Sequence, residues 1–171
     1  ANSQAYRLDR ATGNYELPTN NVTGSEEVTN GGFTNNVDDW AATNNASITW
    51  DSGTIEIVST TNTQGAYQSF TTVVGETYLA IGYSTIASTD HLLRVGDGST
   101  PDAGIADSAT TSTPSVHVVP FTAISTTSYV FFRNSVTGTV NWGNVSVKQV
   151  TNALTYNNIP EADREQFKLV G

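Results

Sequence analysis

The sequence contains no cysteine and no methionine, and only 13% of its 171 residues are charged. The absence of cysteine excludes disulfide bonds, thiolate zinc sites and thiol nucleophiles, and it leaves the redox compartment open. Lysine and arginine number 7 against 16 acidic residues, which gives a net charge of −9. Nucleic acids and anionic membranes bind clustered basic residues, so neither is an expected partner. The apolar runs are too short to span a bilayer.

Uncharged polar residues are abundant in place of charged ones, with 27 Thr, 16 Ser, 16 Asn and 14 Gly. Threonine favours strands, whereas serine, asparagine and glycine favour turns. This composition is typical of an all-β protein, a class common among extracellular, adhesive and virion proteins.

Eight short segments between residues 25 and 150 have the alternating or continuous apolar pattern of strands. Residues 51–53 and 74–76 are turn signals, and each predicts a tight hairpin between the strands that flank it. Residues 96–115 read as a long polar loop. The spacing predicts a two-sheet antiparallel β-sandwich, most simply a jelly roll, with these strands: 47–50, 54–59, 66–71, 77–85, 92–95, 116–124, 128–133 and 140–148.

The two ends lack a sustained period and are predicted to lie outside the 25–150 domain. Residues 1–24 read as an extended arm, and residues 151–171 as a tail with a short helix that begins at Pro160. Isolated apolar residues on such segments favour docking onto a partner, with the ordering entropy lost on binding. Packing of both ends against the sandwich as edge strands is the alternative.

Several motifs resemble those of a known family. They are Asn-Gly-Gly-Phe at 30–33, Trp40, Ala-Tyr-Gln-Ser-Phe at 66–70, Val-Gly-Glu-Thr-Tyr at 74–78 and Asn-Val-Ser-Val at 144–147. In this order they resemble carbohydrate-binding modules of the family four/nine type, which have a galactose-binding-like jelly roll. The resemblance covers about residues 25–150. It implies a core that includes these residues: Phe33, Trp40, Phe70, Tyr78 and Phe131.

The resemblance also implies two sites. A glycan groove would use Tyr83, Gln68, Arg94 and Trp50, which combine aromatic rings for stacking with amide and guanidinium donors. Family members often hold a structural calcium ion, for which Glu26, Glu27 and Asn144 are the candidates. The last-strand aspartate of the family pattern is replaced by Gly143 beside Asn144, which removes an oxygen ligand and disfavours calcium. No other cofactor is expected.

Catalysis is not expected from these residues. Most acidic residues fall in turns or tails, whereas glycoside hydrolysis needs two carboxyl groups facing each other. A catalytic triad is disfavoured because no Gly-x-Ser-x-Gly elbow is present, and His91 and His117 read as surface or half-buried strand residues. Asp97, Asp102 and Asp107 read as turn residues, with a loose cation loop as the alternative.

Two functions follow from the sequence. The first is a non-enzymatic phage virion protein, foremost a capsid decoration or cement protein and otherwise a tail or fibre module. Its partners would be the major capsid protein or tail components, reached through the terminal arms, with host-surface glycans as weak additional ligands. It would occur in the virion as a homo-oligomer or as lattice-bound copies. The alternative is an extracellular carbohydrate-binding module of a bacterial polysaccharide-degrading enzyme or adhesin.

Overall fold

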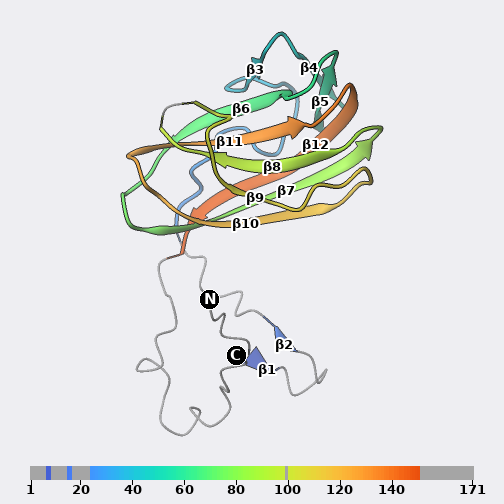
Figure 1. Cartoon of the computed structure of the whole chain (residues 1–171). Coiled ribbons are helices and arrows are strands. Elements are labelled where there is room, and N and C mark those ends of the chain that lie inside the picture. The colour runs from blue at the N-terminus through green and yellow to red at the C-terminus, as the bar shows by residue number, and fades with distance from the viewer. Residues whose placement is uncertain (1–6, 9–14, 17–23, 99, 151–171) are drawn as a thin grey trace, which may run out of the picture. The chain divides into compact units, whose positions relative to one another are not determined.

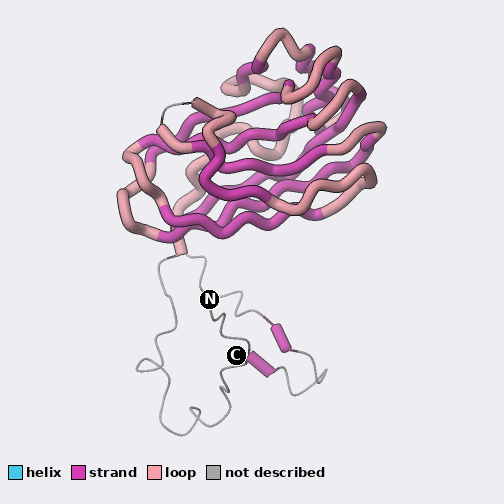
Figure 2. Tube along the Cα trace, in the orientation of Figure 1, coloured by secondary structure: helices cyan, strands magenta, loops and turns pink. Residues whose placement is uncertain are grey.

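The computed structural model describes residues 7–8, 15–16, 24–98 and 100–150. Every regular element in these ranges is a strand (Figure 2), which confirms the all-β class. No helix among the described residues is long and apolar enough to cross a membrane. Residues Ser25–Gln149 form one compact unit. The predicted arm, tail and helix at Pro160 fall almost wholly outside the described residues.

Two strands precede this unit, β1 (Arg7–Leu8) and β2 (Tyr15–Glu16), and they pair with each other antiparallel.

The compact unit consists of two five-stranded antiparallel sheets that pack face to face (Figure 1). Sheet I has the strand order β10 (Val116–Thr122), β7 (Thr77–Ala87), β12 (Gly138–Gln149), β5 (Thr54–Ser59), β4 (Ser47–Asp51). Sheet II has the order β3 (Ala41–Thr43), β6 (Gln64–Thr71), β11 (Thr127–Asn134), β8 (His91–Gly96), β9 (Gly104–Asp107). The β-sandwich predicted from the sequence is confirmed.

All eight predicted strands are present, but one predicted hairpin is wrong. Asp51 pairs with Thr54 across a two-residue turn in which Ser52 and Gly53 both have positive φ, as the sequence predicts. Residues 74–76, in contrast, connect β6 of sheet II with β7 of sheet I. Gly75 has a φ of 88°, so the chain does turn there. Its N–H bonds to Ala123 rather than closing a hairpin, and the connection therefore crosses between the sheets.

Two strands of the sandwich are absent from the sequence prediction. Ala41–Thr43 is a three-residue edge strand, and Gly104–Asp107 lies inside the segment expected to be an irregular polar loop. Both strands pair with only one neighbour, at the two edges of sheet II.

Aromatic rings fill the space between the sheets. Trp40 stacks on Phe132 with ring centroids 4.8 Å apart, and Phe132 stacks on Trp142 at 4.5 Å. Phe33 packs against both Trp40 and Phe132, with ring centroids 5.3 Å and 6.4 Å apart. Phe33, Trp40, Phe70 and Tyr78 lie in this core, as predicted. Phe131 is fully buried but does not belong to the core cluster, because its neighbours Val130 and Phe132 occupy the inner face.

The Asn-Gly-Gly-Phe segment enters the core as a compact loop. The Asn30 side chain donates hydrogen bonds to the backbone carbonyl oxygens of Asn36 and Asp38. A Cβ at Gly31 would collide with the carbonyl oxygen of Val145, whose N–H donates to Gly31. The loop thereby fits against the last strand and delivers Phe33 to the core.

Candidate functional site

The outer face of sheet II carries aromatic and charged side chains at neighbouring positions. Inner positions of β6, β11 and β8 belong to the core, so the alternate residues of each strand point outward. By strand register, Tyr67, Phe131 and Arg94 form one row across this face. Tyr129 is one outward position along β11, and its ring meets that of Tyr67 edge-on at 5.8 Å. Both tyrosines are partly exposed, whereas Phe131 beside them is fully buried.

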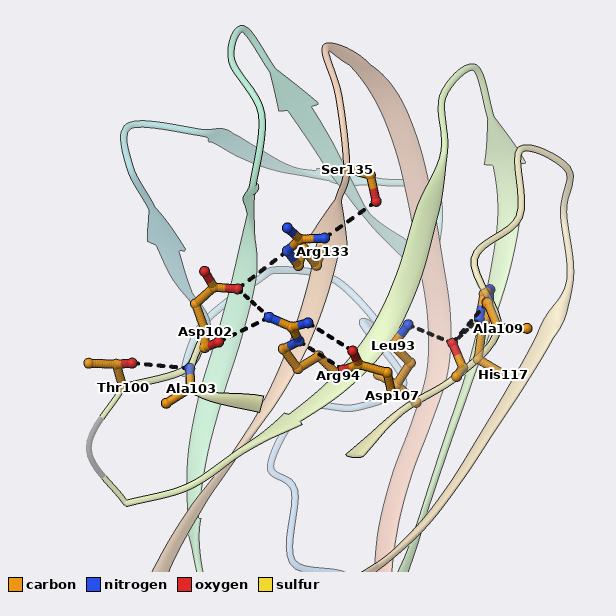
Figure 3. A network of polar contacts seen from close by, with 11 residues as sticks. Leu93, Arg94, Thr100, Asp102, Ala103, Asp107, Ala109, His117, Arg133 and Ser135 are labelled. Atoms are coloured by element: carbon orange, nitrogen blue, oxygen red, sulfur yellow. Dashed lines mark hydrogen bonds and ion pairs between the residues drawn. The ribbon is translucent and has the colours of Figure 1, made fainter. Parts of the chain in front are cut away.

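An ion-pair network continues the row toward the β9 edge (Figure 3). Arg94 donates to both carboxylate oxygens of Asp107, Nε to Oδ1 at 2.8 Å and Nη2 to Oδ2 at 2.8 Å. Its Nη1 donates to Asp102 Oδ1 at 2.7 Å and to the Asp102 carbonyl at 3.0 Å. Arg133 Nε lies 3.3 Å from the same Asp102 oxygen as an ion pair without hydrogen-bond geometry. Asp102 therefore bridges two guanidinium groups.

The electrostatics of this face are balanced. Two arginines face two aspartates, and hydrogen bonding to Asp107 is the main cause that raises the pKa of Arg94 above its ordinary value. The Asp102 side chain remains 52% exposed, so its free carboxylate oxygen can accept hydrogen bonds from a ligand. Partly exposed rings beside charged donors and acceptors suit a hydroxyl-rich, uncharged ligand, because rings pack on C–H faces and charged groups bond hydroxyls.

The four residues predicted to line a glycan groove do not share a face. Arg94 lies on the outer face of sheet II. Gln68 points inward from β6 and is buried: its Oε1 accepts from the Thr29 N–H at 2.7 Å, and its Nε2 donates to the carbonyls of Thr29 and Asp39. Gln68 therefore fastens the loop before β3 to the sheet.

Tyr83 and Trp50 belong to sheet I. Tyr83 is 41% exposed on the outer face of β7, opposite Val116. Trp50 lies on the edge strand β4, where its Nε1 donates to the Phe33 carbonyl at 2.7 Å. The two tyrosines of sheet II and Arg133 are site residues that sequence reasoning missed. The signal available was outward parity in strands 66–71 and 128–133, but parity alone does not tell which strands are neighbours.

The calcium candidates are engaged in other contacts. Glu26 accepts hydrogen bonds from the Ser146 hydroxyl at 2.6 Å and the Val147 N–H at 2.7 Å, so its carboxylate binds the last strand directly. Glu27 accepts from the Ser25 hydroxyl, and Asn144 is exposed on a bulge with a φ of 51°. Calcium takes about six to eight oxygen ligands. The described residues contain no group of three acidic or histidine side chains that could hold a metal, so they do not fit a calcium site.

The two histidines differ from their expected environment. The sequence predicts surface or half-buried positions, but His91 is 0% exposed and His117 is 2% exposed. Each occupies an inward position, His91 at the start of β8 and His117 in β10. Strand alternation near the ends of a sheet does not tell how far the opposite sheet extends, and here it covers both rings.

Comparison with known proteins supports the family resemblance at the level of fold. No protein-family model matches the sequence, and no curated protein matches it. The chain is similar to a solved CBM4 structure, with a TM-score of 0.57 and 14% identity over 71% of this chain and 99% of the other. It is also similar to the CBM22-1 xylan-binding domain of Paenibacillus barcinonensis Xyn10C, with a TM-score of 0.59 and 12% identity over 76% of this chain and 97% of that domain.

A third similar structure comes from a virus. It is the enzymatically active domain of tailspike protein 4 from bacteriophage CBA120, with a TM-score of 0.52 and 17% identity. The match covers 73% of this chain but 21% of the tailspike chain. At these identities the similarities show a jelly-roll fold shared with carbohydrate-binding modules.

Proposed function

We propose that the β-sandwich is a non-catalytic carbohydrate-binding module that binds a glycan on the outer face of sheet II. The observation that carries the proposal is the adjacency of Tyr67 and Tyr129, with ring centroids 5.8 Å apart, to the row of Arg94 and its aspartates. Two rings provide apolar contact area for sugar faces, and the charged groups provide directional hydrogen bonds.

The same contacts support binding rather than hydrolysis. Glycoside hydrolysis needs one carboxyl group as a proton donor and a second one facing it across the bond. On this face, Asp102 and Asp107 are both held by Arg94 as hydrogen-bond acceptors. Their role in the proposal is to orient the arginine and to accept hydrogen bonds from sugar hydroxyls.

Glycan binding is tested with a glycan array followed by calorimetry on the strongest ligand. Tyr67→Ala and Tyr129→Ala should each weaken binding by about tenfold or more, since each removes an aromatic contact. Tyr83→Ala is the matched control, because Tyr83 is equally a strand tyrosine with an exposed ring, but on sheet I. Loss of binding in the Tyr83 variant alone would contradict the assignment to sheet II. An array without any ligand would contradict glycan binding itself.

A second candidate role is that of a phage tail or fibre module, which the similarity to the CBA120 tailspike domain favours. This role and the capsid decoration role expected from the sequence rank after carbohydrate binding. Two of the three similar structures described above are carbohydrate-binding modules. Detection of the chain in purified phage particles by mass spectrometry would support the virion role. Its detection only among secreted polysaccharide-degrading enzymes would contradict that role.

A further inference from the structure

Both histidines of this chain meet at one buried position between the sheets. His91 comes from β8 of sheet II and His117 from β10 of sheet I. Their ring centroids are 5.2 Å apart and their planes are inclined at 59°. The Trp142 ring closes the cluster on one side, 5.3 Å from His91 and 4.6 Å from His117. Every imidazole of the chain is therefore in one cluster.

The orientation of His91 follows from its hydrogen bonds. Its Nδ1 lies 2.9 Å from the carbonyl oxygen of Thr89, which can only accept. Nδ1 therefore carries the proton, and Nε2 presents a lone pair. This Nε2 lies 2.9 Å from the hydroxyl oxygen of Ser84.

His117 directs its own Nε2 to the same hydroxyl. Its Nδ1 lies 2.8 Å from the Ser108 hydroxyl, and its Nε2 is 3.5 Å from Ser84 Oγ. Ser84 Oγ accepts the Ser115 N–H at 2.9 Å, and its own proton has two acceptors within reach, His91 Nε2 at 2.9 Å and the Ser115 carbonyl oxygen at 3.3 Å. The contact of the buried His117 Nε2 with Ser84 Oγ, at 3.5 Å, is longer than an ordinary N–H···O hydrogen bond.

The separation of the two rings is compatible with one metal ion bound by both histidines. Two imidazoles bound through Nε2 to one tetrahedral ion, with metal–nitrogen distances of about 2.0–2.1 Å, have ring centroids about 5 Å apart. In such sites the second ring nitrogen is usually bonded to a carbonyl or another polar group, which is the role of Thr89 and Ser108 here. We propose that His91 and His117 together bind one divalent transition-metal ion through their Nε2 atoms, beside the Ser84 hydroxyl.

The chemistry of the cluster selects the class of ion. Imidazole nitrogens with a hydroxyl suit Zn²⁺, Ni²⁺ or Cu²⁺, whereas Ca²⁺ and Mg²⁺ need several carboxylate or carbonyl oxygens.

A surface depression adjoins His117. A depression of about 310 Å³ is lined by residues that include Ser108, Ser115 and His117. His91 and Ser84 are not part of this lining, so an ion that enters here must displace side chains to reach both Nε2 atoms. Because two histidines supply the only nitrogens, we expect one ion per chain and weaker binding than in structural sites with four protein ligands. The site is separate from the glycan-binding face and does not depend on it.

Cu²⁺ is the probe for the test, with the protein prepared without a histidine tag. We expect one ion per chain and a pulsed electron paramagnetic resonance spectrum that contains two imidazole couplings per copper. Zn²⁺ should raise the melting temperature and Ca²⁺ should not. A spectrum with one imidazole or none, in the wild-type protein itself, would overturn the proposal.

Variants separate a metal site from a polar core cluster. His117→Gln should abolish the two-imidazole spectrum. Ser108→Ala keeps both ligands and should weaken binding by about 10–100-fold, as loss of a group that orients a ligand does. Tyr67→Ala, on the outer face of sheet II, should bind Cu²⁺ as the wild type does. Unchanged copper binding in both the His117 and the Ser108 variants would contradict the proposal, and Ser108→Ala keeps that test open if the histidine variant fails to fold.

Discussion

Arg94 holds Asp107 in the adjacent strand by two parallel hydrogen bonds, each 2.8 Å long. The two residues are cross-strand partners of β8 and β9, so this fork fastens the edge strand of sheet II. A rigid, planar guanidinium matches a carboxylate in a way that a lysine ammonium cannot. The outer face of sheet II, where we propose glycan binding, therefore depends on an arginine at this position.

Arg94→Lys should lower the free energy of unfolding by about 1–2 kcal/mol, because the fork to Asp107 and the bonds to Asp102 are lost while the charge remains. It should also weaken glycan binding. Arg133→Lys is the matched control, since Arg133 pairs with Asp102 at 3.3 Å without hydrogen-bond geometry. Urea denaturation measures both variants. Equal losses in the two would show that the fork contributes nothing specific.

Gln68→Leu should destabilise the sandwich by at least about 1–3 kcal/mol, because it leaves the N–H of Thr29 and the carbonyls of Thr29 and Asp39 without their partner. Thermal melting measures the effect. Ser69→Ala, at the adjacent exposed position, should change the free energy of unfolding by no more than about 0.5 kcal/mol. A Gln68 variant with normal stability but no glycan binding would restore the role expected from the sequence.

Gly31→Ala should destabilise by about 1–3 kcal/mol or more, because its Cβ meets the backbone carbonyl of Val145, which cannot move aside cheaply. Gly32→Ala should be tolerated, since the nearest atom to its added Cβ is Thr34 Oγ1 at 4.0 Å. Melting temperatures of the two single variants check this contrast. If both variants are equally destabilised, the glycines of the Asn-Gly-Gly-Phe segment are required for backbone conformation rather than for close packing against Val145.

Acid should destabilise the metal-free protein through His117. The folded-state pKa is about 4, below the ordinary value of 6.5, because burial disfavours the charged ring. On acidification the unfolded chain takes up the proton first, so stability is complete above about pH 6.5 and declines as the pH falls toward 4. The melting temperature, measured in the presence of a chelator between pH 7 and pH 5, follows this decline. Most carboxylates stay ionised over that pH range. His117→Gln should reduce the decline without removing it, because burial also lowers the pKa of His91. An equally steep decline in that variant would disprove the assignment to His117.

The strand pattern was predictable because each strand carries its own signal. In Thr54–Ser59, for example, Ile55 and Ile57 alternate with polar residues, and the observed strand has the predicted bounds. The strand Gly104–Asp107 has no such signal, because it is only four residues long and none of its side chains is buried. It pairs with β8, where Arg94 holds Asp107. Local pattern thus predicts long, half-buried strands and misses short edge strands that only tertiary contacts stabilise.

The candidate site was less predictable for a related reason. Periodicity tells that Tyr67, Tyr83 and Tyr129 point outward, but not that β6 and β11 are neighbours while β7 belongs to the other sheet. The turn at residues 74–76 looked like a hairpin, and this interpretation would have placed Tyr83 beside the strand of Tyr67. One crossing connection was enough to move Tyr83 to the opposite side of the sandwich.

The position of β12 has a consequence for how the chain folds. This last strand of the sandwich lies between β7 and β5, so until it docks, sheet I is only two separate pairs, β10 with β7 and β5 with β4. A ribosome must therefore release residue 149 before the barrier to folding can be crossed. Topologies dominated by such distant pairings fold slowly, on the order of milliseconds to seconds. During that interval the inner edges of β7 and β5 are unpaired strand edges, which are prone to aggregation.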